Sequence, residues 1–326
     1  MPASLTEVLD NLYASTFHHR REAVIDNVFA ATPFWFYLKE KKKLKSVSGG
    51  RQILDTIEYA ENDSVSFIGR GGTVSLNDRE FLTNSVWNWH YLVGSIVRFG
   101  VDDQQNRGKT RILDLANAKV NNLQESLISL METTLCAGAG AVGGAFDGLQ
   151  HLVKNDPTTG AVVGNIDPTV AAGAYWRNKT DTMSGSSFAT NGTAKMRTMV
   201  NNCMNNRAMD RPDIILTTQT VFEFCEDNIL DKFQIQDKKM ADLGFENIKF
   251  KNIPLIWSPS VATGLMYFLN TRFITFHYDP AVFFDMTEWK SIPDQVNDRA
   301  AQVITACGFT TNRRRVQGVI HTIDTA

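Results

Sequence analysis

One long amphipathic helix is predicted between Arg107 and Cys136, and it constrains the fold more than any other part of the sequence. Apolar residues recur there mostly at spacings of three and four, which is the period of one face of an α-helix. These positions are Ile112, Leu115, Leu123, Leu127, Leu130 and Met131. A helix of about thirty residues spans roughly 45 Å at 1.5 Å per residue. The rest of the fold must therefore accommodate a single element of that length.

A glycine cluster, GAGAVGG, follows the helix directly at residues 138–144. Gly138, Gly140 and Gly143 match the dinucleotide-binding pattern G-x-G-x-x-G letter for letter. That pattern binds a pyrophosphate only where the glycines turn a strand into a helix, so that the phosphates lie on the helix N-terminus. Here the helix precedes the glycines, and a further glycine and a proline follow too soon for another long helix. A flexible joint to a second domain is the favoured interpretation, and a nucleotide-dependent enzyme is a distant alternative.

Composition limits the functions that are open to the chain. Its 326 residues leave room for about two domains. Lysine and arginine number 33 against 35 acidic residues, so there is no large positive field to hold nucleic acid, and any such contact must be local. The sequence shows neither a signal peptide nor an apolar stretch long enough to span a membrane. We therefore expect a cytoplasmic product without membrane association.

No catalytic, cofactor or metal site is indicated by the sequence. The cysteines lie far apart, without a C-x-x-C motif or a nearby histidine pair, which argues against both a zinc site and a disulfide framework. They are Cys136, Cys203, Cys225 and Cys307, and we expect them to be buried, reduced thiols. The H-E-x-x-H, G-x-S-x-G and P-loop motifs are also absent. The sequence therefore predicts a protein that is not an enzyme and that needs no cofactor.

The first part of the chain is predicted to form an arm followed by a ribbon. Residues 4–31 carry an apolar helical stripe that ends near Pro33, where the aromatic run PFWFY leads into a run of lysines. We expect residues 1–48 to be an arm, not a core element. Over 49–94, alternating β-branched and aromatic residues between turn dipeptides predict a long two-stranded ribbon with a glycine-rich tip near 69–78. Such a ribbon cannot bury both faces alone, so it must fold back or lie on a neighbour.

The remainder of the chain alternates short helices and strands. Helices are predicted at Thr193–Met209 and in QTVFEFCEDNIL, and strands in RPDIILTT, IPLIWSPS, LMYFLN and FITFHYD. This order is typical of an α/β or α+β domain around a central sheet. The tail carries two alternating runs, AAQVITACGF and RRRVQGVIHTI, which predict an antiparallel hairpin that returns to the first domain.

The order of these parts resembles the major capsid proteins of tailed bacteriophages, which have the Hong Kong 97-type α+β fold. SVSGGRQILDTIEYAENDSVSFIGRGGTVSL resembles the extended loop of that family, LDLANAKVNNLQESLISLMETTL its spine helix, and IKFKNIPLIWSPS with GLMYFLNTRFITF the strands of its axial domain. The resemblance is topological and covers essentially the whole chain. It implies an N-terminal arm over 1–48, an extended loop over 49–85, a peripheral domain over 86–137 and 291–326 with its spine helix at 107–136, and an axial domain over 138–290.

The resemblance also implies a function and a set of partners. The chain is expected to assemble through pentamers and hexamers into the icosahedral head that encloses the double-stranded DNA of a tailed phage. Its partners would be further copies of itself, a portal protein and, in some heads, a cement protein. A separate scaffolding protein is also expected, because the chain reaches its loop by Gly49. The protein would lie in the virion after assembly in the host cytoplasm, and an encapsulin-like compartment shell is the closer alternative.

Roles for individual residues follow from the same resemblance. Assembly contacts are expected at Phe34, Trp35, Arg51, Arg70, Gly71, Gly72 and Arg79. The conformational range of glycine would let a domain hinge accept the different angles of five- and six-membered rings. Its residues are Gly138, Gly140, Gly143 and Gly144. The concentrated positive charge is either a solvated face or a contact with packaged nucleic acid. It comprises Lys41, Lys42, Lys43, Lys45, Arg313, Arg314 and Arg315.

Overall fold

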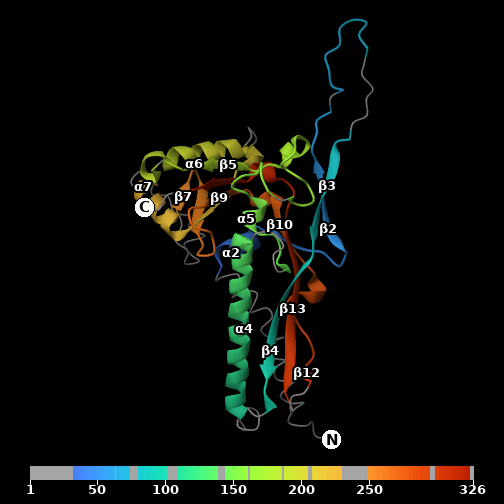
Figure 1. Ribbon diagram of the computed structural model, residues 1–326, viewed down its shortest axis with the longest axis vertical. Coiled ribbons are helices and arrows are strands. Elements are labelled where there is room, and N and C mark those ends of the chain that lie inside the picture. Colours follow the sequence, from blue (N-terminus) through green and yellow to red (C-terminus); the bar gives the residue numbers. More distant parts are fainter. Residues whose placement is uncertain are drawn as a thin grey trace.

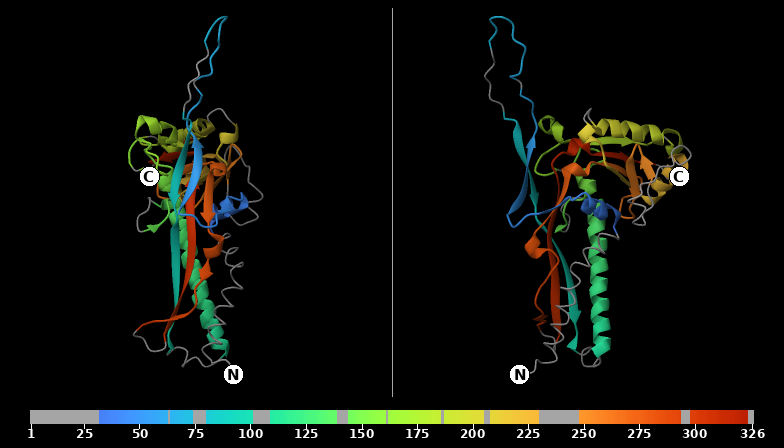
Figure 2. Two further views of the ribbon diagram at one scale, coloured as in Figure 1. Left: turned by 90° about the vertical axis from the view of Figure 1, so that its right-hand side faces the viewer. Right: turned by 180° about the vertical axis from the view of Figure 1, so that it is seen from behind.

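The computed structural model describes residues 32–62, 64–73, 80–100, 109–138, 144–160, 162–185, 187–204, 208–229, 248–293 and 298–323. A long helix and two long strands run side by side as a stem, and a compact head of shorter elements lies at one end of that stem (Figure 1). A two-stranded ribbon projects beyond the head (Figure 2). The molecule is therefore elongated, with its two thinnest parts at opposite ends.

The chain forms both helices and strands, as the predicted α+β class requires. The α-helices are α2 (Pro33–Glu40), α4 (Lys109–Ala137), α5 (Leu149–Leu152), α6 (Phe188–Met204) and α7 (Gln219–Ile229). The 3₁₀ helices are η2 (Ala171–Trp176), η3 (Ala208–Asp210), η4 (Thr271–Phe273), η5 (Pro280–Val282) and η6 (Arg314–Val316). The strands are β1 (Leu44–Ser46), β2 (Gln52–Glu58), β3 (Leu82–Asn88), β4 (His90–Arg98), β5 (Lys179–Thr182), β6 (Ile214–Thr217), β7 (Ile248–Phe250), β8 (Ile253–Trp257), β9 (Met266–Leu269), β10 (Ile274–Tyr278), β11 (Asp285–Met286), β12 (Lys290–Ser291), β13 (Arg299–Thr311) and β14 (Gly318–His321).

The first sheet, called the stem sheet here, is organised by the 13-residue strand β13. The first part of β13, from Arg299 to Cys307, pairs antiparallel with β4. Its last part, from Cys307 to Thr311, pairs antiparallel with β10, which in turn pairs with β1 in parallel. The short strands β11 and β12 complete the sheet. Helix α4 lies along β4 (Figure 1). Gly94 permits this close approach, because a Cβ at that position would lie 2.5 Å from the Leu123 side chain.

The second sheet, called the head sheet, has the strand order β5-β14-β9-β6-β8-β7. Alternate residues of its central strands point to two different cores, as the two-residue period of a strand requires. In β6, Ile215 packs with α6 and α7, whereas Ile214 and Leu216 belong to the larger core that the head shares with the stem sheet. The centre of the head sheet is therefore covered on both faces, which explains the almost uninterrupted apolar sequences of β6, β8 and β9.

The long helix is present where the sequence predicts it. α4 spans Lys109–Ala137 and ends immediately before the glycine cluster, and the helix that follows the cluster, α5, has only four residues. The helix predicted at Thr193–Met209 begins earlier, at Phe188, and its described part ends at Met204. Its first turns contain Gly192, a poor helix former, but Phe188 at its start is buried in the core with Ile215 and Phe222. Tertiary packing thus extends the helix beyond its favourable sequence.

The predicted C-terminal hairpin is wrong. β13 lies in the stem sheet, whereas β14 lies in the head sheet, parallel to β5 and antiparallel to β9. β10 shows the reverse difference. It falls within the predicted axial segment 138–290, yet it pairs with β13 in the stem sheet. Two strands therefore cross the boundaries predicted from the sequence. Alternation alone indicates a strand but does not specify its partner, and this explains the error.

The aromatic run PFWFY is also placed differently from the prediction of an arm. It forms α2, and Phe34, Trp35, Tyr37 and Leu38 are buried in the larger core. Trp35 packs edge to face on Phe276 of β10, with ring centroids 4.3 Å apart. The spacing of the four buried residues places them on one helical face, so this stretch is a core element although lysines follow it. Residues 1–31 of the predicted arm lie outside the described residues.

A buried arginine directs the chain from β13 towards β14. The Arg314 side chain in η6 is fully buried. Its Nε donates a hydrogen bond to the Leu152 carbonyl oxygen at 2.7 Å, and its Nη2 donates to Asn178 Oδ1 at 3.1 Å. Burial lowers the pKa of the Arg314 guanidinium to about 10. The side chain therefore joins three separate parts of the head from inside, and the prediction that it faces nucleic acid is wrong.

We expect Arg314→Ala to lower the free energy of unfolding by about 3 kcal/mol, because it leaves the buried Leu152 carbonyl and Asn178 amide oxygen without this donor and opens a cavity. Chemical denaturation followed by circular dichroism measures the change. Arg315→Ala is the matched control, since Arg315 is the exposed neighbour. Equal losses in the two variants would contradict the role assigned to Arg314.

A buried carboxyl group lies where α4, α2 and the head sheet meet. Glu132 Oε1 accepts a hydrogen bond from Ser258 Oγ at 3.0 Å, and Cys136 Sγ lies 3.8 Å from the same oxygen. Burial raises the pKa of Glu132 from an ordinary value of 4.5 to about 7. The hydrogen bonds from Ser258, Cys136 and the backbone N–H groups in the first turn of α2 oppose that rise. Glu132 therefore holds a proton in the folded protein at pH values where an exposed glutamate has lost it.

This proton makes stability depend on pH. Between about pH 4.5 and 7 the folded protein retains a proton that the unfolded chain has released, so raising the pH favours the unfolded state by up to roughly 3 kcal/mol. Glu132→Gln should remove that contribution and flatten the pH dependence of the free energy of unfolding over this window. Glu125→Gln, on the exposed side of the same helix, is the control. Indistinguishable pH profiles for the two variants would refute this assignment.

Candidate functional site: the projecting ribbon

The base of the ribbon is a paired β-hairpin with one buried face. β2 and β3 pair antiparallel from Gln52↔Asn88 to Glu58↔Leu82. Ile53, Ile57 and Trp87 on the inner face are buried, whereas the outer-face residues between them are exposed or half-buried. The ribbon predicted over 49–94 is confirmed for β2 and β3, whereas the chain from His90 onward forms β4 and pairs with β13 in the stem sheet. The period of two in β2 and β3 places every second side chain against the body of the protein.

Several contacts fix the base of the ribbon to the body. The Tyr59 ring stacks on Tyr175 of η2 with centroids 5.3 Å apart, and Thr310 Oγ1 of β13 donates a hydrogen bond to Asp55 Oδ2 at 3.1 Å. The Val86 N–H donates to the Gly164 carbonyl oxygen at 3.0 Å. Gly164 has φ +59, and a Cβ there would lie 2.9 Å from the Trp87 ring. The base is therefore held by the stem sheet and by the head.

The distal part of the ribbon exposes large apolar side chains. Val65 and Phe67 are 83% and 109% exposed, and Leu54 on the outer face of the base is 61% exposed. Ile68, Phe81 and Leu82 are further exposed apolar residues of the same ribbon. Both views in Figure 2 place this segment away from the body. Because an isolated two-stranded ribbon cannot bury such residues itself, this surface is suited to contact with another molecule.

The expected assembly residues fall into three groups. Arg51 is exposed at the ribbon base, and Arg70, Gly71 and Gly72 are exposed at its tip, beside Phe67. The Gly72 N–H donates to the Gly69 carbonyl oxygen at 3.0 Å, which closes a turn there. Arg79 lies outside the described residues. Phe34 and Trp35 are buried within the protomer, so the prediction that they form assembly contacts is wrong.

The apolar residues that dominate the tip were not predicted from the sequence. Val65 and Phe67 alternate with Ser64 and Ser66, which is the pattern of a strand with one apolar face. This alternation could have identified Val65 and Phe67 as an apolar face within the loop. The residues predicted at the tip were arginines and glycines, which form its turn, and its apolar side chains were not among them.

Two of the predicted hinge glycines are described, and Gly140 and Gly143 lie outside the described residues. Gly138 follows the end of α4, where its carbonyl oxygen accepts a hydrogen bond from the Gly148 N–H at 3.2 Å. A Cβ at Gly138 would lie 2.6 Å from the Thr134 carbonyl oxygen, so close backbone packing requires glycine there. Gly144 has φ +83, a conformation that favours glycine. Gly148, which was not predicted, is the packing partner of Gly138.

The predicted basic residues do not form one surface. Lys41, Lys42 and Lys45 are exposed and Lys43 is half-buried, whereas Arg314 is buried. Arg313 forms an ion pair with Asp210, with Nη1 and Oδ1 2.7 Å apart, and its guanidinium lies over the Phe273 ring. Arg315 is exposed. The structure thus separates the arginine run by burial and pairing, and leaves the lysine run largely accessible.

The described residues give no indication of a metal site or a membrane span. No group of three or more His, Cys, Asp or Glu side chains is arranged to hold a metal ion among them. Within the same residues, no helix has the length and apolar character needed to cross a bilayer. All four cysteines are buried and unpaired, which confirms their predicted burial.

Gly164→Ala should loosen the base of the ribbon, because alanine at φ +59 is strained by roughly 1–2 kcal/mol and its Cβ would meet Trp87. We expect amide hydrogen exchange in β2 and β3 to become about tenfold faster. Gly185→Ala is the control, since Gly185 has φ +69 but its Cβ would meet no atom within 4 Å. Unchanged exchange in the Gly164 variant would show that this contact does not hold the ribbon.

Comparison with known proteins gives the fold a precedent. No protein-family profile matches the chain, and no curated protein sequence matches it. A chain of the cyanophage A-1(L) capsid is similar in structure, with TM-score 0.65 and 14% sequence identity over 85% of this chain and 90% of that one.

Two further solved structures are similar. A chain of the capsid of the native GTA particle has TM-score 0.55 and 9% identity, covering 87% of this chain and 89% of that one. A chain of the satellite phage P4 procapsid has TM-score 0.51 and 8% identity, covering 93% and 90%. The likeness extends over nearly the whole of each chain. The protein therefore has the Hong Kong 97-type fold of tailed-phage major capsid proteins.

Proposed function

We propose that this protein is the major capsid protein of a tailed bacteriophage. Copies of the chain assemble through pentamers and hexamers into the icosahedral head that encloses double-stranded DNA, and the mature location of the protein is the virion. The observation that carries the proposal is the projecting ribbon, whose apolar side chains are left exposed by the described part of the chain. The fold supports it, because the similar structures come from capsids and a procapsid.

The shape of the ribbon favours a contact of the head-to-tail kind. Its apolar residues protrude from one end of the molecule, so they meet a different surface on the next copy and not their own equivalent. Such heterologous contacts close into rings when the rotation between copies permits it. Each contact is small, but every copy in a closed shell makes one, and many weak contacts together give a durable structure.

The parts of the protomer have corresponding roles in this proposal. The stem, with α4 and the stem sheet, forms the peripheral domain, and the head forms the axial domain around the symmetry axes. The glycines after α4 form the joint between them, where Gly138 and Gly144 are the described members. Portal, scaffolding and cement proteins are the further partners that such a head employs.

The direct test is to express the chain alone and to examine it by negative-stain electron microscopy and light scattering. Pentamers, hexamers, tubes or shells would support the proposal. A strictly monomeric or dimeric protein over a wide range of concentration and salt would overturn it. The contents of particles purified from infected cells separate a phage head, which holds DNA, from an encapsulin-like compartment, which holds cargo enzymes.

We expect Phe67→Ser to impair assembly without affecting the protomer. Burial of a phenylalanine side chain contributes roughly 1.5–3 kcal/mol, so the loss should weaken each ribbon contact by a factor of about 10 to 100. Light scattering would then detect assembly only at a correspondingly higher protein concentration, with an unchanged melting temperature. Phe67→Leu should largely restore assembly, and Ser66→Ala is the exposed control. Normal assembly of Phe67→Ser would exclude this residue from the interface.

A further inference from the structure

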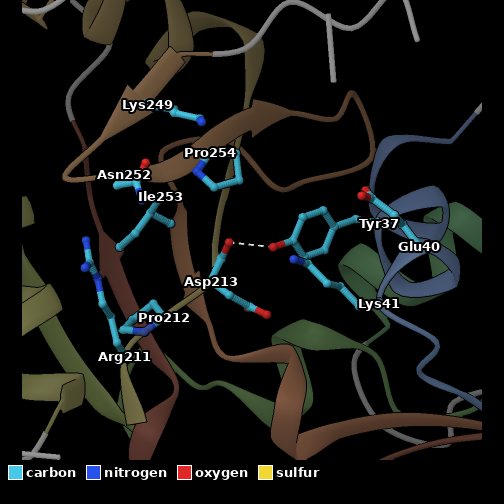
Figure 3. Close-up of a pocket in the computed structure, with 10 residues that line it drawn as sticks. All are labelled: Tyr37, Glu40, Lys41, Arg211, Pro212, Asp213, Lys249, Asn252, Ile253 and Pro254. Atoms are coloured by element: carbon cyan, nitrogen blue, oxygen red, sulfur yellow. Dashed lines mark hydrogen bonds between the residues drawn. The ribbon is translucent and has the colours of Figure 1, made fainter. Parts of the chain in front are cut away.

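A pocket of about 390 Å³ lies where α2, the segment before β6 and the β7–β8 hairpin meet (Figure 3). Three positively charged residues from distant parts of the sequence line it, namely Lys41, Arg211 and Lys249. Figure 3 shows these side chains approaching the same space from different sides. The Tyr37 hydroxyl donates a hydrogen bond to the Asp213 carbonyl oxygen at 2.6 Å, which joins α2 to the head beside the pocket.

The positive charge continues around the edge of the head sheet. Lys251, in the turn between β7 and β8, is exposed and donates a hydrogen bond to Asn201 Oδ1 of α6 at 3.3 Å. Its pKa is lowered by partial burial and by the positive charges of Arg197 and Arg211. A row of cations therefore runs from Arg197 on α6, past Lys251 and Arg211, to Lys41 at the end of α2. Like charges that disfavour one another are stabilised when an anion binds between them.

Two acidic residues, Asp213 and Glu40, line the pocket against three cations. Both carboxylate oxygens of Asp213 accept hydrogen bonds from Thr271, one from its backbone N–H and one from its hydroxyl. Burial raises the pKa of Asp213, and the hydrogen bonds from Thr271 and the positive charge of Lys41 oppose that rise. Glu40 is the remaining acid among the lining residues, and it is exposed. The balance of charge at this edge is thus positive in a protein whose formal net charge is −2.

We propose that this edge of the head, defined by Arg197, Lys251, Arg211 and Lys41, binds phosphate groups, and that its ligand is the backbone of the packaged nucleic acid. Arginine and lysine are the side chains that bind phosphate oxygens, and a row of them suits a polyanion better than a single carboxylate. The contact reads no base sequence. The choice of ligand rests on the proposed function, whereas the recognition of phosphate rests on the site itself.

The site provides the local positive charge that a nucleic-acid contact requires in this chain. Lysine and arginine are not in excess over the whole chain, so nucleic-acid contact must be local. Lys41 is the only member of this row that belongs to the basic runs identified in the sequence. The other members are isolated in sequence and are brought together by the pairing of β7 with β8 and by the packing of α6 on the head sheet.

The test is binding of a fluorescent 30-base-pair DNA duplex to the full chain, measured by anisotropy over a range of salt concentrations. Each lost phosphate contact should reduce the slope of log affinity against log salt by about 0.9, so Arg211→Gln/Lys251→Gln should lower it by about 2. We expect at least a tenfold loss of affinity at low salt. Arg211→Lys/Lys251→Arg, which keeps both charges, should retain the slope. A melting temperature of the glutamine variant close to that of the wild type would show that its loss of affinity is not due to unfolding.

Lys290→Gln is the matched control, because Lys290 is exposed on β12, far along the stem from the head (Figure 1). Sodium tripolyphosphate, titrated by calorimetry, distinguishes the sources of phosphate. Loss of both duplex and tripolyphosphate binding in the double variant assigns the site to the nucleic-acid backbone, and loss of tripolyphosphate binding alone assigns it to a free phosphate compound. Wild-type binding of both ligands by the double variant would overturn the proposal.

The result of the phosphate-binding test can be distinguished from the result of the assembly test. A double variant that forms normal shells but binds DNA like the wild type would refute the phosphate site and leave the shell proposal intact. A chain that never assembles, yet loses tripolyphosphate binding in the double variant, would refute the shell proposal and retain the site.

Discussion

The pairing of strand β13 on two sides is the constraint on which the rest of the structure depends. Its first residues pair with β4, which lies on α4, and its last residues pair with β10, which carries the packing of α2. Residues of β13 also contact the ribbon, through Thr310 and Asp55. A strand that fixes the stem, the N-terminal helix and the ribbon base transmits the position of each part to the others. After the turn at Arg314, the chain enters the head sheet as β14.

The elements that were predicted correctly are those with a strong local pattern. α4 follows from its apolar spacing, and β2 and β3 follow from alternation, because these signals depend only on neighbours in sequence. α2 was misplaced because the lysines after PFWFY obscured a face of four buried residues. The partner of β14 and the burial of Arg314 depend on β5, Leu152 and Asn178, which are more than a hundred residues away in the sequence. No local pattern contains that information.

The candidate site was predicted in part for the same reason. Alternation located the ribbon, and the glycines located its turn at Gly71 and Gly72. The exposure of Val65 and Phe67 is a property of the ribbon's position relative to the body, which the sequence does not specify. The positions of the basic residues also depend on the tertiary fold. Arg314 is buried instead of exposed, and Arg211 lines the same pocket as Lys41 although the two are far apart in sequence.

The anchoring of the ribbon has a mechanical consequence. The Tyr59–Tyr175 stack and the backbone contact at Gly164 hold the base, while the apolar tip lies far from it in the loop between β2 and β3. The ribbon thus behaves as a lever with its fulcrum in the protomer: a small rotation at the base becomes a large displacement at the tip. In a shell, the reach from one protomer to the next would therefore depend on contacts that each base makes within its own protomer.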